Sequence, residues 1–202
     1  MAYNAMFFKL YANYLAEPLV RHNHDQVFKK FFDFAALPNA HPRIVAAVID
    51  FGCGLGEFEW RGCPGWYVGV DRRKARPFEH FIKADYHDLE KVAVRLPFPP
   101  NIFTSLFSIE ITHSAKKKYA FYETIFDRFP SIRYGLVGGF FYANRHHKEK
   151  VREAGGVVSW QTIEDPALHI SLTFDEYRLH ITTPSAMFGP DVVEVWKFFA
   201  RR

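Results

Sequence analysis

The chain has 202 residues, of which 49% are hydrophobic and 24% charged, so it is long enough for one α/β domain and too hydrophobic for a disordered protein. The formal net charge of +4 is modest, and the basic residues are spread along the sequence, which argues against a dedicated nucleic-acid-binding arm. The two cysteines do not indicate a disulfide framework, and no apolar run reaches the length of a membrane span. We therefore expect a cytoplasmic protein.

The N-terminal part of the chain, residues 3–36, is predicted to be helical because apolar residues recur there at three- and four-residue spacing. Pro18 is expected to separate two helices and Pro38 to end the second, since proline lacks the amide hydrogen that a helix interior requires. We interpret residues 1–40 as a helical cap on an α/β core of residues 41–202, the whole forming a single domain. This cap could also act as a lid over a ligand.

Strands and helices then alternate along the chain. Strands are predicted at 45–51, 66–71, 81–85, 102–109 and 132–142. Helices are predicted at 73–80, 89–96, 115–129 and 145–154. This alternation is typical of a doubly wound, mostly parallel sheet. The last part of the chain differs, because the strand-like runs follow one another without a helix, which predicts an antiparallel end to the sheet. These runs are 157–163, 168–174, 177–182 and 192–199.

Three glycines alternate directly after the first predicted strand, at Gly52, Gly54 and Gly56. Glycine permits a tight turn and lets a ligand approach the backbone closely. A dinucleotide-binding fingerprint requires a further glycine three residues after Gly54, where this chain has Glu57. The carboxylate of Glu57 would repel a pyrophosphate near the start of the following helix. A nucleoside ligand without phosphates and with a cationic centre therefore fits better than a nicotinamide dinucleotide.

Two acidic residues end the next two predicted strands. Asp71 follows Asp50 by 21 residues and could accept both hydroxyls of a ribose, or it could cap a segment that starts at Arg72. Asp85 could accept the amino group of an adenine while Tyr86 lies against the ring. Asp85 could instead cap the next helix, a role for which Asp88 competes.

At this point the sequence resembles a known family. The run Val48–Gly56, VIDFGCGLG, resembles motif I of the class I S-adenosylmethionine-dependent methyltransferases, and the runs Tyr67–Asp71 and Ala84–Tyr86 are similar to their second and third motifs. The resemblance implies a Rossmann-like fold with a seven-stranded sheet whose last strand is antiparallel, and S-adenosylmethionine as the cofactor. It also implies that Asp50 helps to hold the methionine amine, Asp71 the ribose and Asp85 the adenine.

The cofactor-binding residues that follow from this resemblance are Asp50, Phe51, Gly52, Cys53, Gly54, Gly56, Asp71, Arg72, Asp85, Tyr86 and Ser108. One departure from the family lies between the first two strands, where the family has a full helix. Here residues 57–65 leave room for about one helical turn, because glycine and proline recur in this segment.

The segment 108–114 follows the fourth predicted strand, at the edge that faces the transferable methyl group in the family. It lacks the Asn/Asp-Pro-Pro-aromatic motif of enzymes that methylate exocyclic amino groups of bases or glutamine, which argues against those acceptors. Glu110 or His113 could act as a general base or orient the acceptor. Alternatively, Glu110 is a solvated surface residue and His113 caps the next helix.

The function predicted from the sequence is therefore methyl transfer from S-adenosylmethionine to an unidentified acceptor: a small molecule, a protein or a nucleic acid. A non-catalytic binding protein with the same fold is an alternative from a different class, and a nicotinamide-dependent oxidoreductase is a less favoured one. The histidines do not have metal-binding spacing, and no membrane partner is expected.

Overall fold

The structure, a computed structural model, describes residues 12–35, 46–54, 66–73, 80–109, 115–140, 159–162, 172–182 and 191–201. The strands of these ranges are β1 (Ala47–Phe51), β2 (Trp66–Asp71), β3 (Phe81–Lys83), β4 (Ile102–Leu106), β5 (Tyr134–Phe140), β6 (Ser159–Thr162), β7 (Leu172–Thr182) and β8 (Asp191–Arg201). The helices are α2 (Pro18–Phe34), α3 (Leu89–Ala93) and α5 (Ala115–Arg128), and residues 12–16 are also helical.

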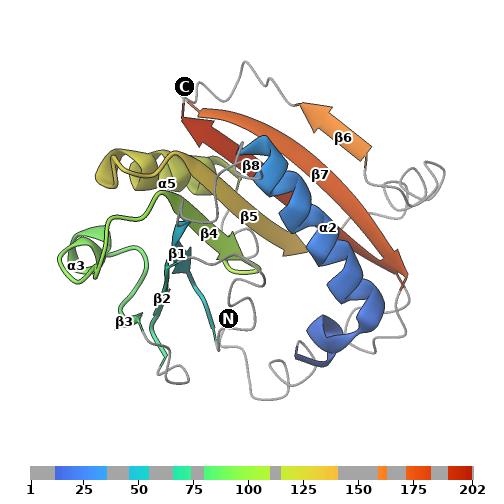
Figure 1. Ribbon diagram of the computed structural model, residues 1–202, viewed down its shortest axis with the longest axis horizontal. Helices are drawn as coiled ribbons and strands as arrows, with labels where there is room; N and C mark the ends of the chain where they lie inside the picture. The colour runs from blue at the N-terminus through green and yellow to red at the C-terminus, as the bar shows by residue number, and fades with distance from the viewer. Residues whose placement is uncertain are drawn as a thin grey trace.

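All eight of these strands belong to one mixed sheet, in the order β3-β2-β1-β4-β5-β8-β7-β6 (Figure 1). The first five strands of this order run parallel, and β8, β7 and β6 add antiparallel pairs. The predicted combination of a parallel part and an antiparallel end is therefore confirmed. The predicted number of seven strands is wrong, because the described part of the chain alone contributes eight.

One predicted break in the sheet is also wrong. Residues 168–174 and 177–182 were expected to form separate strands, but Leu172–Thr182 is one continuous strand. The polar residues Asp175 and Glu176 stay in the ladder opposite Phe198 and Lys197 of β8, so pairing with a long neighbouring strand outweighs the local preference for a turn. The helices predicted at 73–80 and 145–154 stay predictions, because residues 74–79 and 141–158 lie outside the described ranges.

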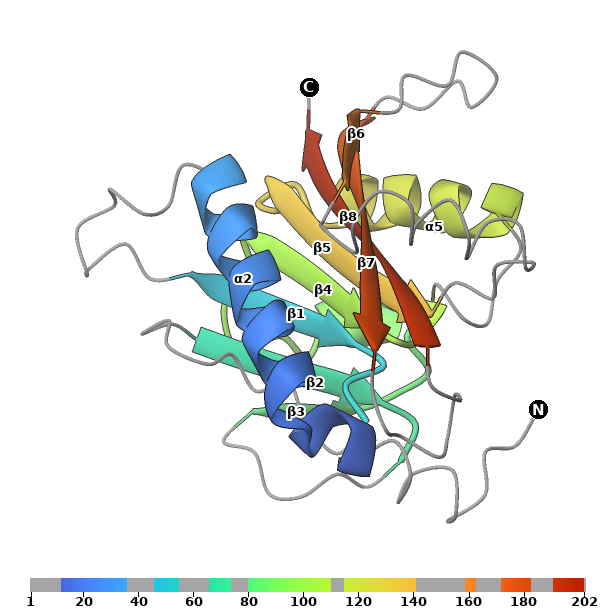
Figure 2. The same cartoon turned by 90° about the vertical axis from the view of Figure 1, so that its right-hand side faces the viewer.

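The N-terminal helices are separated at Pro18, as predicted, whereas Pro38, which was expected to end the second helix, lies outside the described residues. Residues 12–16 form one helical segment, Glu17 interrupts it, and α2 starts at Pro18, where the missing amide hydrogen of proline costs nothing. Figures 1 and 2 show that α2 crosses one face of the sheet while α5 lies on the other.

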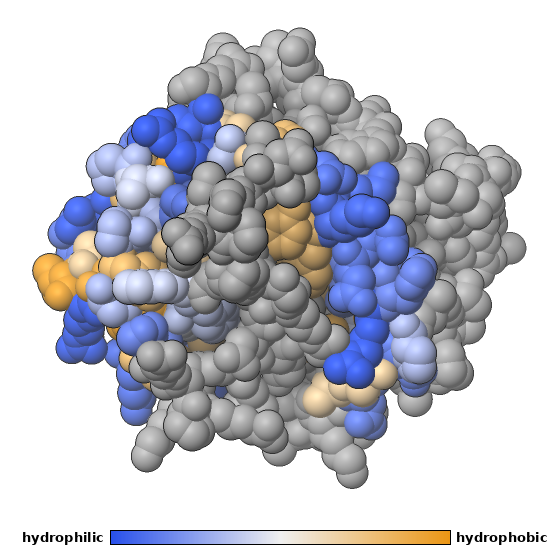
Figure 3. All heavy atoms as spheres, viewed as in Figure 1, coloured by the Kyte–Doolittle hydropathy of each residue, from blue (hydrophilic) through white to orange (hydrophobic). Residues whose placement is uncertain are grey.

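The core is divided by the sheet into two layers, because successive strand residues point to opposite faces. Val48 packs in the layer under α2, together with Val27 and Phe31, whereas Ile49 packs in the layer under α3 and α5, together with Phe126. The outward face of α2 is hydrophilic, as Figure 3 shows. Within the described ranges, no helix has both the length and the apolar character needed to cross a bilayer.

Candidate functional site

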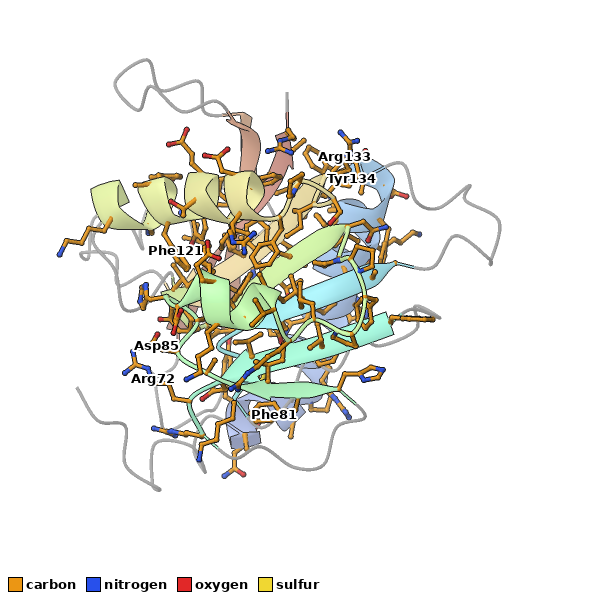
Figure 4. The ribbon with its side chains drawn as sticks, turned by 90° about the vertical axis from the view of Figure 1, so that its left-hand side faces the viewer. Arg72, Phe81, Asp85, Phe121, Arg133 and Tyr134 are labelled. Carbon is orange, nitrogen blue, oxygen red and sulfur yellow. The ribbon has the colours of Figure 1, made fainter. Side chains whose placement is uncertain are left out.

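The carboxyl ends of the parallel strands meet at one edge of the sheet. From β1 the chain proceeds to β2 and β3 on one side, while β4 and β5 lie on the other side. Strand order therefore reverses between β1 and β4, and ligands of open α/β sheets bind in the crevice outside such a point. Figure 4 shows Arg72 and Asp85 at this edge and Arg133 and Tyr134 at the opposite one.

The glycine turn after β1 has a backbone that few residues other than glycine adopt. Gly52 has φ +75° and Gly54 has φ +59°, both in the left-handed region. The amides of Gly52 and Cys53 donate to the carbonyl oxygen of Val70, at 2.8 and 3.2 Å, which folds the turn over the end of β2. A Cβ atom on Gly52 would lie only 2.6 Å from the Cβ of Ser108. The turn therefore needs glycine at position 52 both for its backbone angle and for its contact with Ser108.

The end of β4 is attached to the end of β1 by a side chain that the sequence interpretation missed. The Ser105 hydroxyl donates to the carbonyl oxygen of Phe51 at 3.0 Å and accepts from the amide of Ile109 at 3.3 Å. This fixes the spacing between the glycine turn and the segment that contains Ser108. The Phe51 side chain itself is fully buried and packs near Phe103 in the core, so Phe51 contributes to this edge through its backbone.

Asp71 lies at the end of β2 and contacts the glycine turn directly. Its Oδ2 accepts from the amide of Gly54 at 3.0 Å, and its Oδ1 accepts from the amide of Arg73 at 2.9 Å. The second bond closes a local turn of the kind that the capping alternative anticipates. A carboxylate offers about four lone-pair positions, so these two bonds are compatible with further acceptance from ribose hydroxyls. Asp71 therefore holds the turn and retains the capacity for a ligand.

Asp50 is almost completely buried, with 2% of its surface exposed, and its Oδ2 accepts from the Tyr67 hydroxyl at 2.6 Å. Tyr67 was not predicted as a site residue. The pairing of β1 with β2 explains how Tyr67 comes close to Asp50. In this register Val48 pairs with Tyr67, and Asp50 pairs with Gly69 two residues further along. Because Gly69 has no side chain, the Tyr67 ring and the buried Cys53 thiol share the space above it. A buried carboxylate thus lies two residues before Gly52, held by the Tyr67 hydroxyl.

The end of β3 is more open. The guanidinium of Arg72 lies 3.0 Å from Asp85 Oδ2, and these side chains are 65% and 41% exposed. Asp85 Oδ1 accepts from the amide of His87 at 3.0 Å, whereas Asp88 caps α3. The Tyr86 ring is half-buried and reaches the glycine turn, since a ring carbon would lie 3.6 Å from a Cβ atom on Gly52.

The structure therefore brings together most of the predicted cofactor-binding residues, from the ends of four strands. Gly56, Glu110 and His113 lie outside the described residues, so their predicted roles stay predictions. Within the ranges that the structure describes, no group of three or more His, Cys, Asp or Glu side chains could hold a metal ion.

No protein-family model matches the chain, and no curated protein sequence matches it. Solved structures do resemble it. A protein of Pyrococcus horikoshii OT3, PH0226, has 12% identity, 100% coverage of both chains and a TM-score of 0.48. The N-terminal domain of human METTL16 in complex with SAH has 9% identity, covers 85% of this chain and 68% of its own, and has a TM-score of 0.46.

A third similar structure is an antibiotic-related methyltransferase, with 12% identity, coverage of 78% of this chain and 88% of its own, and a TM-score of 0.40. Several of the similar structures are thus methyltransferases. At TM-scores of 0.48 or less, these similarities add no weight to a functional assignment. A functional assignment therefore depends on the residues at the strand ends.

Proposed function

We propose that this protein is an S-adenosylmethionine-dependent methyltransferase. The observation that carries the proposal is the contact between Asp71 and the glycine turn: a carboxylate at the end of β2 accepts the Gly54 amide at 3.0 Å at the point where the strand order reverses. That arrangement supports the proposal because a carboxylate able to accept from ribose hydroxyls lies beside a turn that a ligand can approach closely.

The residues of this edge fit the chemical parts of S-adenosylmethionine. Asp71 would hold the ribose, while Asp85 and the half-buried Tyr86 ring would face the adenine. The buried carboxylate of Asp50 lies two residues before Gly52 in the chain and would favour a cationic group near this edge, such as the methionine amine. When bound, the cofactor would supply a methyl group on a positively charged sulfur.

Methyl transfer from a sulfonium is a direct displacement, so the protein mainly has to align the two reactants and exclude water. The hydrogen bonds from Ser105 to Phe51 and from Gly54 to Asp71 give the edge a fixed geometry, which is what alignment requires. We infer that Ser108 and the following residues form the acceptor side of the site, with Glu110 and His113 as candidates for orienting or deprotonating the acceptor.

A nicotinamide-dependent oxidoreductase is disfavoured by Glu57, which stands where a dinucleotide fingerprint has glycine. A non-catalytic binding protein is favoured by one feature, the short segment 57–65 where the methyltransferases have a helix. A methyltransferase and a non-catalytic binding protein of this fold would both bind S-adenosylmethionine, but only the methyltransferase would turn it over.

The test is isothermal calorimetry with S-adenosylmethionine, S-adenosylhomocysteine and NAD, on the wild type and on Asp71→Ala. We expect binding of the first two ligands and at least about tenfold weaker binding by the variant, equivalent to about 1.4 kcal/mol. Asp71→Asn is the matched control for local structure, because one amide oxygen can still accept from the Arg73 amide. Binding of NAD alone would overturn the proposal, and an unchanged affinity of Asp71→Ala would remove the ribose role.

A further inference from the structure

A buried polar cluster links the N-terminal helices to β8. Glu194 of β8 is fully buried, and its carboxylate accepts from the Tyr14 hydroxyl at 2.6 Å and from the Trp196 indole N–H at 2.9 Å. His24 of α2 places Nε2 within 3.0 and 2.8 Å of the two carboxylate oxygens. Since Glu194 acts as acceptor for the other two groups, we assign the donor role to His24 Nε2. The imidazole is therefore held in one orientation.

The orientation of His24 matters because its ring forms part of an aromatic cluster. The centroid of the His24 ring lies 5.0 Å from that of Trp196, with the rings edge to face, and 5.9 Å from that of Phe107. Phe107 and Trp196 are also edge to face, at 5.6 Å. Pairs at these separations have favourable quadrupole interactions. The Phe107 ring therefore rests on two rings that Glu194 fixes by hydrogen bonds.

Phe107 has an unusual backbone. It directly follows β4 and has φ +56°, a left-handed conformation that costs a residue with a side chain about 1–2 kcal/mol. Its amide donates to the Gly138 carbonyl oxygen at 2.7 Å, and its ring packs in the layer under α2. This turn of the chain sends the Phe107 ring toward α2 and leaves the next residue, Ser108, over Gly52. The position of Ser108 thus depends on how Phe107 is held.

We propose that His24 is a positioning residue of the candidate site: held by Glu194, it fixes the Phe107 ring and thereby keeps Ser108 against the glycine turn. The expected effect of His24 on cofactor binding rests on the proposed function. In this proposal the N-terminal helices help to hold the candidate site in place and are not a separate cap. His24 is buried, so it acts through Phe107 and does not touch the ligand.

The experiment compares His24→Phe with Tyr14→Phe. The first variant keeps a ring beside Phe107 but removes the hydrogen bond that orients it, whereas the second removes another hydrogen bond of Glu194 without changing the aromatic cluster. We expect His24→Phe to weaken binding of S-adenosylhomocysteine about fivefold, about 1 kcal/mol, at a temperature where both variants are folded. Tyr14→Phe should lower the unfolding midpoint but leave the affinity within about twofold of wild type.

A second readout does not require the cofactor. The backbone amide resonances of Gly52 and Ser108 should shift in His24→Phe and stay in place in Tyr14→Phe. If the wild type bound no S-adenosylhomocysteine, the proposed function would fail, and these resonances alone would decide the role of His24. Unmoved resonances in His24→Phe, or equal shifts in both variants, would overturn the positioning role. If His24→Phe does not fold, His24→Gln replaces it, because it keeps a donor without the ring.

A double-mutant cycle tests whether His24 acts through Phe107. Phe107→Ala removes the ring through which His24 is proposed to position Ser108. We expect it to weaken binding of S-adenosylhomocysteine about as much as His24→Phe. Because the two changes interrupt the same route, the double variant should bind about as well as either single variant. Additive losses would show that His24 acts by another route and would overturn the proposal.

Discussion

The turn after β1 and the end of β3 were both predicted to contact one ligand, and the structure holds them in different ways. Just before the turn, at the end of β1, Asp50 is 2% exposed and accepts from Tyr67 at 2.6 Å, and in the turn Gly52 has no space for a side chain. At the end of β3, the paired side chains of Arg72 and Asp85 are 65% and 41% exposed. The first region is fixed by the protein's own packing, and the second is open to solvent.

This difference changes what each region can contribute. A hydrogen bond to a charged group typically contributes about 1.5–3 kcal/mol, whereas an exposed ion pair contributes about 0–1 kcal/mol. Mutations at the turn should therefore affect folding and ligand binding together. Mutations at the end of β3 should affect ligand binding with little effect on folding.

The largest effect is expected for Gly52→Ala. The left-handed backbone costs an alanine about 1–2 kcal/mol, and overlap with Ser108 adds about 1–3 kcal/mol. We expect the free energy of unfolding, measured by urea denaturation, to fall by about 2–5 kcal/mol, with loss of binding to S-adenosylhomocysteine.

The double variant Gly52→Ala, Ser108→Gly separates these two causes. Removing the Ser108 side chain should restore the part lost to overlap but leave the cost of the backbone angle. A change in unfolding free energy below about 0.5 kcal/mol in Gly52→Ala alone, as for a surface substitution, would contradict the tight contact.

An intermediate effect is expected for Tyr67→Phe. This change removes one hydroxyl donor from the buried Asp50 carboxylate, so the free energy of unfolding should fall by about 1.5 kcal/mol. Cofactor binding should weaken as well, because Asp50 is a predicted cofactor-binding residue that Tyr67 helps to hold. Tyr134→Phe is the matched control, since Tyr134 lies at the opposite edge of the sheet (Figure 4) and should leave the affinity unchanged. Equal losses of affinity in both variants would mean that Tyr67 acts only on general stability.

The sequence predicted best those features that neighbouring residues determine. The second strand was expected at residues 66–71 and β2 is Trp66–Asp71, because an apolar run ends there at an acid. The helix predicted at 115–129 is also confirmed: α5 is Ala115–Arg128, and its Tyr119, Tyr122, Ile125 and Phe126 are buried at helical spacing. In the candidate site, the same local signals identified Gly52 and Asp71.

The features that the sequence could not predict depend on distant residues. His24 and Glu194 are 170 positions apart, and their contact exists only because β8 is inserted next to β5. The Ser105 hydroxyl reaches Phe51 across 54 positions, and no local pattern distinguishes it from any other strand serine. The continuity of β7 likewise depends on its partner β8 rather than on its own polar residues.

The smallest effect on folding is expected for Arg72→Ala, and this variant tests the comparison most directly. Both side chains of the Arg72–Asp85 pair are largely hydrated, so the free energy of unfolding should change by less than about 0.5 kcal/mol, and less still at high salt. Because Arg72 and Asp85 are both predicted cofactor-binding residues, binding of S-adenosylhomocysteine should weaken in Arg72→Ala as well as in Asp85→Ala. A loss of stability above about 1 kcal/mol in Arg72→Ala would exceed what exposed pairs contribute. The end of β3 would then be as rigid as the glycine turn, and the bonds of Asp85 to Arg72 and to the His87 amide, rather than a ligand, would explain its position.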